Sequence, residues 1–175
     1  MLESLITSKT RLRLLGKFFV NAANQAHMRG LADEFGESTN AIRKELNNLS
    51  AAGYLEKKAI ANRIDYRANT AHPLFLPLQD IVRKYLGLDT LVEKVLDRMG
   101  SVEQIWLIGQ YARGIDSGHI EVVVVGQNLD ADYAAQLSAK AEELIQRQVS
   151  IRLEEQFDGK GLLLYEDERP EGISY

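Results

Sequence analysis

The stretch "LADEFGESTNAIRKELNNLSAAGYLEKK", residues 31–58, contains a strongly amphipathic helical pattern. Ser38 is a residue type that favours a helix N-cap, and apolar residues follow at helical spacing from Ile42 to Leu49. Gly53 stands where a left-handed residue would end this helix. The pattern therefore predicts an amphipathic helix, and its opposite face carries Thr39, Asn40, Arg43, Lys44 and Asn47.

Helical and strand patterns lie on both sides of this stretch. Residues 8–21 place apolar side chains at helical spacing with basic residues between them, and residues 27–38 predict a short helix. After the amphipathic helix, "YLEKKAIANRIDYRAN" (residues 54–69) alternates as a β-hairpin does, with a tight reversal at Asn62. On the second strand the alternation separates two faces, which carry Ile64, Tyr66 and Ala68 on one side and Arg63, Asp65 and Arg67 on the other.

Two helices, an amphipathic third helix and a basic hairpin form the layout of a winged helix-turn-helix. Residues 31–58, with their leucine stripe and the "AAGYL" exit into the hairpin, resemble the ArsR-like winged-helix transcription regulators. The resemblance implies binding to double-stranded DNA, because amides and guanidinium groups read base edges while cations neutralise phosphates. The predicted DNA contacts are Thr39, Asn40, Arg43, Lys44, Asn47, Lys57, Lys58 and Arg63. A protein-docking module is the alternative interpretation of the same layout.

The distribution of charge indicates two modules. Residues 1–70 hold 11 Lys and Arg against 7 Asp and Glu, a balance of +4, whereas residues 71–175 hold 10 against 18, a balance of −8. A basic first half favours nucleic acid as its partner.

The absence of cysteine excludes disulfides and thiolate chemistry. The three histidines are far apart in sequence, so we expect no metal site and no cofactor.

Neither a membrane span nor a signal peptide is expected. No apolar run approaches the roughly 18 residues that a transmembrane helix needs, and no secretory pattern opens the sequence. A cytoplasmic protein is therefore predicted.

Residues 71–101 contain two amphipathic helical patterns separated at Gly87, which predict either a rigid spacer or a dimerisation segment. Their apolar content favours dimerisation, and a homodimer would present two DNA readers to two half-sites.

The second half predicts a small domain with a mixed sheet. "VEQIWLIG" (residues 102–109) and "HIEVVVVG" (residues 119–126) are predicted strands, and a helical pattern follows over residues 130–148. Two further predicted strands lie within residues 149–157 and 161–166. The fold class predicted for the chain is α+β with two domains, a winged helix-turn-helix over residues 1–72 and a second domain over residues 100–175, joined by a helical segment over residues 73–99.

The stretch "LIGQYARGIDSGHIEVVVVG", residues 107–126, is similar to the minimal nucleotidyltransferase family. That family has Gly-Ser, an Ala-Arg-Gly turn, and Asp-x-Asp on a second strand that ends in an apolar run and Gly. The matching residues are Gly109, Ala112, Arg113, Gly114 and Gly126. Gln110 falls at the family's serine, and His119 and Glu121 fall at its two aspartates. The third carboxylate falls at Ser150, with Glu154 as the other candidate.

These departures from the family's pattern predict a domain that keeps the nucleotidyltransferase-like fold but has no catalytic activity. Mg²⁺ prefers oxygen ligands, and one carboxylate does not build a two-metal site. A retained pocket for a nucleotide or another anionic effector is one interpretation, with Gly109, Gln110, Arg113, His119 and Glu121 around it. An ordinary polar pair at a sheet end is the other, and Asp116 is interpreted as a turn residue or a displaced ligand.

We therefore expect a dimeric DNA-binding transcriptional regulator, with no catalytic residues and no metal, whose second domain serves for sensing or assembly. The alternative is an active Mg²⁺-dependent nucleotidyltransferase of a toxin–antitoxin type that uses the winged helix as a targeting arm.

Overall fold

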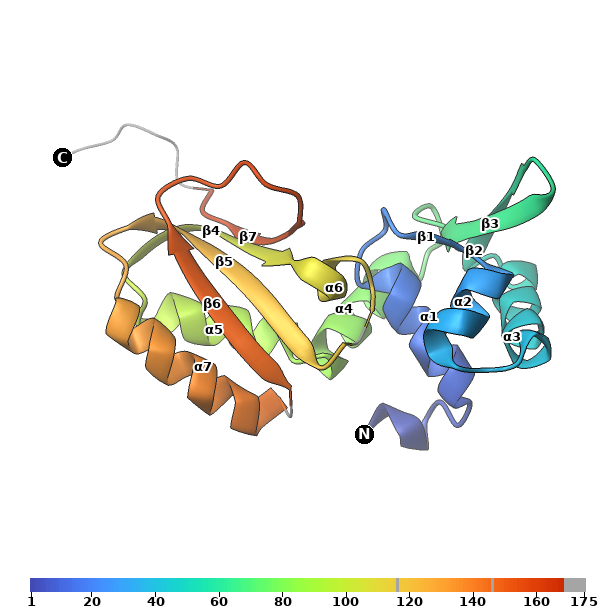
Figure 1. Ribbon diagram of the computed structural model, residues 1–175, viewed down its shortest axis with the longest axis horizontal. Helices are drawn as coiled ribbons and strands as arrows, with labels where there is room; N and C mark the ends of the chain where they lie inside the picture. Colours follow the sequence, from blue (N-terminus) through green and yellow to red (C-terminus); the bar gives the residue numbers. More distant parts are fainter. Residues whose placement is uncertain (116, 146, 169–175) are drawn as a thin grey trace. The chain divides into compact units, whose positions relative to one another are not determined.

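The computed structural model describes residues 1–115, 117–145 and 147–168 (Figure 1). Asp116 therefore lies outside the described residues. The chain divides into two units: Met1–Leu86 with Arg113–Ile115, and Gly87–Ala112 with the residues from 116 onward. The first unit combines helices with a three-stranded antiparallel sheet, and the second combines helices with a four-stranded mixed sheet. The predicted α+β fold class is confirmed.

The first unit contains a short 3-10 helix and three α-helices before its hairpin, and one α-helix after it. The sheet has the order β1-β3-β2, so the strand next to α2 pairs with the second strand of the hairpin. Its described elements are η1 (Leu2–Ser4), α1 (Lys9–Phe19), β1 (Gln25–His27), α2 (Met28–Phe35), α3 (Thr39–Ala51), β2 (Leu55–Ile60), β3 (Arg63–Ala68) and α4 (Phe75–Tyr85).

The amphipathic helix α3 has the ends that the sequence predicts. The Ser38 side chain accepts a hydrogen bond from the backbone N–H of Ala41 at 3.2 Å. Gly53 follows the C-cap residue with a φ of 79°, in the left-handed conformation that favours glycine. The apolar stripe of α3 is buried, with Ile42 and Leu46 fully inaccessible. It packs in the core of the first unit together with Leu14, Phe18, Phe19 and Leu31.

Burial along strand β3 does not follow the expected alternation of buried apolar and exposed polar residues. Ile64 is 45% exposed although it shares a face with the buried residues Tyr66 and Ala68. Ile64 pairs with Ala59, one step from the reversal at residues 61–62, where the helices no longer cover the hairpin. On the other face Asp65 is 8% exposed, because β3 is the central strand and neighbouring side chains surround it.

A buried carboxylate links α3 to the start of α1. Glu45 accepts hydrogen bonds from the Ser8 hydroxyl at 2.9 Å and from Arg11 Nε at 2.8 Å. Ser8 is also the N-cap of α1 and accepts from the backbone N–H of Arg11. Burial would raise the pKa of the Glu45 carboxyl, but the hydrogen bonds from Arg11 and Ser8 outweigh it and hold the pKa below its ordinary value.

Replacing Glu45 with alanine is expected to lower the free energy of unfolding by about 2 kcal/mol at neutral pH, since two hydrogen bonds to a buried charge are lost. Because the folded-state pKa is depressed, this stabilisation is present above the carboxyl's ordinary pKa and is lost as pH falls through the folded-state pKa. Urea denaturation of both proteins at neutral and acidic pH measures the difference. Glu56→Ala, at an exposed ion pair with Arg67, is the control and should cost under about 1 kcal/mol. Equal losses in the two variants would contradict the prediction.

The second unit is built on a sheet of order β6-β5-β4-β7. Strands β5 and β6 are parallel, and the other neighbours are antiparallel. Helices α5 and α7 pack against each other and lie on the same face of the sheet (Figure 1). The described elements are α5 (Leu88–Arg98), β4 (Ser101–Ile108), α6 (Gly109–Ala112), β5 (His119–Gln127), α7 (Ala131–Ile145), β6 (Gln148–Glu154) and β7 (Leu162–Glu166).

The two faces of this sheet differ in chemistry. The face toward the helices is apolar and includes Ile105, Leu107, Val122 and Val124. The other face is polar where the register places Glu121 beside Ser150, and further along β5 it carries the buried side chains of Val123 and Val125. This polar face is where the candidate residues of the second unit lie.

The predicted helical segment over residues 73–99 is two helices that belong to different units. Helix α4 packs on α1 in the first unit, where Phe75 stacks against Phe19 and Gln79 Nε2 donates to the Phe19 carbonyl at 3.2 Å. Helix α5 belongs to the second unit and packs on α7. Among the described residues, none of the helices has the length and apolar character required to span a membrane.

Candidate functional site

The exposed face of α3 carries the predicted nucleic-acid contacts. Thr39, Asn40, Arg43, Lys44 and Asn47 are all exposed. Arg43 Nη1 donates to the Asn40 side-chain oxygen at 3.2 Å, so an amide and a guanidinium lie side by side near the start of the helix. No acidic side chain pairs with Arg43 or Lys44 among the residues that the structure describes.

The β2–β3 hairpin adds further positive charge. Lys57 and Lys58 are exposed and form no ion pair within the described ranges. The third predicted contact, Arg63, is exposed as well, but its Nε lies 3.0 Å from Asp65 Oδ1. Its charge is therefore compensated locally, in contrast to that of the two lysines.

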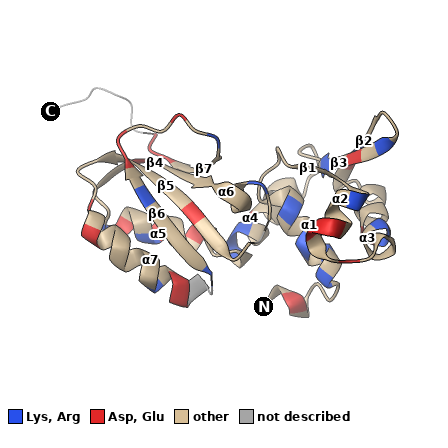
Figure 2. Cartoon of the chain, viewed as in Figure 1, with Lys and Arg blue, Asp and Glu red and all other residues tan. Residues whose placement is uncertain are grey.

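The α3 face lies next to the hairpin. Tyr66 of β3 is 7% exposed, and burial raises the pKa of its hydroxyl while the nearby Arg43 guanidinium opposes that rise. Figure 2 shows Lys and Arg residues on α3 and along the hairpin. We call the four cations Arg43, Lys44, Lys57 and Lys58, which form no ion pair among the described residues, the basic face; Lys57 and Lys58 follow each other on β2 and extend to opposite sides of the hairpin.

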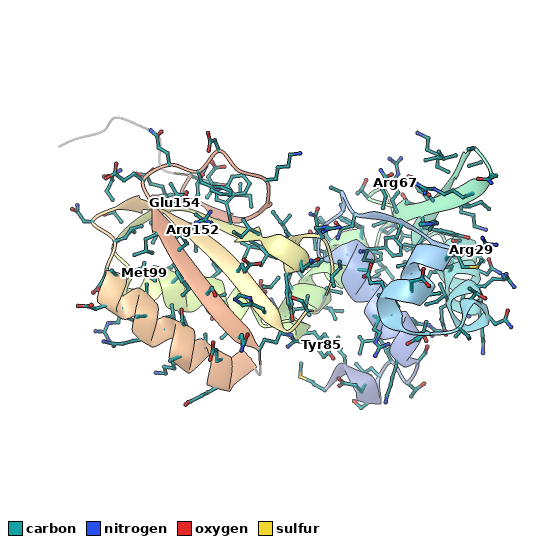
Figure 3. All side chains as sticks on the ribbon, in the orientation of Figure 1. Arg29, Arg67, Tyr85, Met99, Arg152 and Glu154 are labelled. Atoms are coloured by element: carbon teal, nitrogen blue, oxygen red, sulfur yellow. The ribbon has the colours of Figure 1, made fainter. Side chains whose placement is uncertain are left out.

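Several other cations of the first unit are neutralised by carboxylates. Arg67 of β3, labelled in Figure 3, pairs with Glu56 across the hairpin at 2.8 Å. On α1 the neutralised cations pair as Arg11 with Glu45, Arg13 with Glu37 and Lys17 with Glu34. Acidic side chains thus pair with three of the four cations of α1, all but Lys9, and leave the charge of the basic face available to an anionic partner.

In the second unit, Gly109 and Glu121 lie against each other at the end of β4. Gly109 begins α6 with a φ of 67°, and a Cβ added there would overlap the Glu121 carboxylate. Glycine is thus needed both for the backbone conformation and for the close approach of the carboxylate. Gln110, the next residue, is exposed.

The second strand and its parallel neighbour bring together the other aligned positions. His119 Nε2 lies 2.6 Å from the Ser150 hydroxyl, and Ser150 is the register partner of Glu121. Glu154, the other candidate for the third carboxylate, pairs with Val125 in register and lies next to Arg152, with Nε and Oε1 2.5 Å apart (Figure 3). Ser150 is therefore bonded to His119 and paired in register with Glu121, whose carboxylate is turned toward Gly109.

Two further features of this site concern Arg113 and the residue types that bind metal ions. Arg113 is exposed and is grouped with the first unit, so we do not count it in the cluster of His119, Glu121 and Ser150. Within residues 1–115, 117–145 and 147–168, no three His, Asp or Glu side chains are arranged to hold a metal ion. The cluster offers one carboxylate, one imidazole and one hydroxyl, a set suited to hydrogen bonding and proton transfer.

Sequence reasoning did not identify an open groove of about 860 Å³ at the far end of the polar face. Phe157 lines it and stacks on Trp106 with ring centroids 5.6 Å apart. Its acidic lining comes from separate segments of the second unit and consists of Glu103, Glu155, Asp158, Glu166 and Asp167. The acidic runs near residues 154–158 and 166–168 were the available signal, but only the pairing of β4 with β7 brings them together.

Comparison with known proteins gives one distant similarity in structure. No family model matches the sequence, and no curated protein matches it. A solved chain described as a crystal structure of a toxin-antitoxin MntA-HpeT mutant is similar to this chain with a TM-score of 0.40 and 16% sequence identity. The similarity covers 46% of this chain and 73% of that chain. It does not assign the protein to a family.

Proposed function

We propose that this protein is a DNA-binding transcriptional regulator that reads duplex DNA with α3 and supports the contact with the β2–β3 hairpin. The observation that carries the proposal is the basic face, where Arg43 and Lys44 on α3 and Lys57 and Lys58 on the hairpin lack acidic partners among the described residues. Exposed amides on the same helix supply groups that can hydrogen-bond to base edges.

The element order of the first unit supports a winged helix-turn-helix of the ArsR-like kind. Helices α2 and α3 follow each other after a short turn, and the hairpin comes directly after α3. In that architecture the second of the two helices enters the major groove. We further propose that the protein acts as a homodimer, which would place two such helices on two half-sites.

For the second unit we propose a nucleotidyltransferase-like domain that no longer transfers nucleotides and that serves for sensing or assembly. The support is chemical: Glu121 is the one carboxylate in its cluster, and the other two positions are His119 and Ser150, bonded to each other. Incubation of the protein with radiolabelled ATP and Mg²⁺ tests this part. Transfer of the labelled nucleotide to a protein or nucleic acid, lost in Glu121→Ala, would overturn it and favour an active transferase.

Binding to duplex DNA is expected to depend steeply on salt. If the four cations of the basic face each neutralise one phosphate, the plot of log K against log salt concentration has a slope of about −3.6. Fluorescence anisotropy with a labelled duplex of arbitrary sequence, from low to moderate salt, measures this slope. An absence of binding at low salt would overturn DNA binding and favour a protein-docking role, which pull-down after nuclease treatment would then test.

A further inference from the structure

His119 and Ser150 form a base–hydroxyl pair on the polar face of the second unit. They lie on the neighbouring parallel strands β5 and β6, and His119 Nε2 is 2.6 Å from Ser150 Oγ. Strand β6 is an edge strand of the sheet, Ser150 is exposed, and His119 is half-buried. The hydroxyl is thus open to small molecules while the imidazole beside it is held by the strand.

A serine hydroxyl is a weak nucleophile until a neighbouring base takes its proton, and imidazole is the usual base. The required geometry is a heavy-atom distance of about 2.6–3.2 Å, which the pair satisfies. In the tautomer with its proton on Nδ1, His119 accepts the hydroxyl hydrogen at Nε2. We propose that Ser150 is a nucleophile activated by His119, and that it accepts the acyl group of small activated esters.

The step balances without a metal or a redox partner. Ser150 Oγ attacks the carbonyl carbon of the donor, forming a new C–O bond while the bond from that carbon to the leaving group breaks. The hydroxyl proton moves to His119 Nε2 and from there to the leaving group or to solvent. The product is an ester on Ser150, and His119 returns to its neutral form.

Glu121 sets the charge of the donor that fits. It is the register partner of Ser150, and its carboxylate is turned toward Gly109 on the same face of the sheet. A negative charge on the same face of the sheet as the nucleophile repels anionic donors. Uncharged esters are therefore preferred over phosphorylated ones. This reactivity is separate from nucleotide transfer and does not depend on DNA binding.

The full chain with 4-nitrophenyl acetate tests the proposal. We expect release of 4-nitrophenolate with the gain of one acetyl group, located by peptide mass spectrometry at Ser150. Ser150→Ala should lose that label, whereas Ser101→Ala, at an exposed strand serine, should keep it. His119→Gln should slow labelling at Ser150 roughly a hundredfold because glutamine cannot act as a base. Labelling of Ser150 at the same rate with and without His119 would overturn the proposal.

A second variant keeps the test independent of folding defects. The chain has no cysteine, so Ser150→Cys introduces its single thiol. If His119 activates this position, that thiol should react with iodoacetamide at least tenfold faster than the thiol of the Ser150→Cys/His119→Gln double variant. Equal alkylation rates in the two proteins, both folded by circular dichroism, would overturn the proposal.

Discussion

Replacing Gly126 with alanine is expected to lower the free energy of unfolding by about 3 kcal/mol. A Cβ at this position would overlap the Ser101 carbonyl oxygen and lie 3.0 Å from the Ser101 carbonyl carbon and 3.1 Å from Val102 Cα. These are backbone atoms of β4, which pairs with β5 here next to a register shift. Unlike the tip of a flexible side chain, they cannot turn aside, so the two strands must separate.

The single tryptophan makes this measurable for the second unit alone. Trp106 lies on β4, so its fluorescence during urea denaturation follows the sheet that contains Gly126. Gly16→Ala is the control, because Gly16 lies inside α1 of the first unit with nothing within 4 Å of an added Cβ, so the Trp106 fluorescence midpoint should stay unchanged. A Gly126→Ala protein with an unchanged fluorescence midpoint would show that β4 and β5 do not approach this closely.

Removing two cations from the basic face is expected to weaken DNA binding by roughly 30-fold. The double variant Arg43→Gln/Lys44→Gln keeps both exposed side chains polar and removes their charge. Because two phosphate contacts are lost, the slope of log K against log salt concentration should become less negative by about 2. Fluorescence anisotropy with the same duplex over a salt series gives both numbers.

A matched variant separates local contact from net charge. Arg13→Gln/Arg67→Gln also removes two charges from the first unit, but both arginines are half-exposed and paired with carboxylates. We expect its affinity to fall by less than about threefold, since those cations are neutralised within the protein. Equal losses in the two double variants would mean that the overall charge, and not the basic face, attracts DNA.

The local features of the first unit could be predicted because they depend on neighbours in sequence. Ser38 caps α3, Gly53 follows its last turn, and Ile42 and Leu46 are buried, each as expected. Helix caps and apolar periodicity act within a few residues, so they are visible without the fold. The juxtaposition of His119, Glu121 and Ser150 could be anticipated only from the resemblance to a family, since Ser150 is on a different strand.

The features that were not predicted depend on contacts between distant segments. Arg63 is an exception, because its partner Asp65 lies two residues further along the same strand and on the same predicted face, so this ion pair is local in sequence. The bonds from Ser8 and Arg11 to Glu45 span more than 30 residues of sequence. The acidic groove likewise needs the register of β4 with β7, which alternation alone does not determine.

The strand order of the second unit has a consequence for the order in which the chain can fold during synthesis. The helices and the sheet of the first unit are complete once residue 86 has left the ribosome. The second unit must wait for residues 162–166, because β7 is the partner of β4 on one edge. Until β7 arrives, β4 has an open apolar edge, the kind of surface through which nascent chains aggregate. Translational stalls between residues 127 and 162 should therefore yield chains with a folded first unit and an aggregation-prone second one.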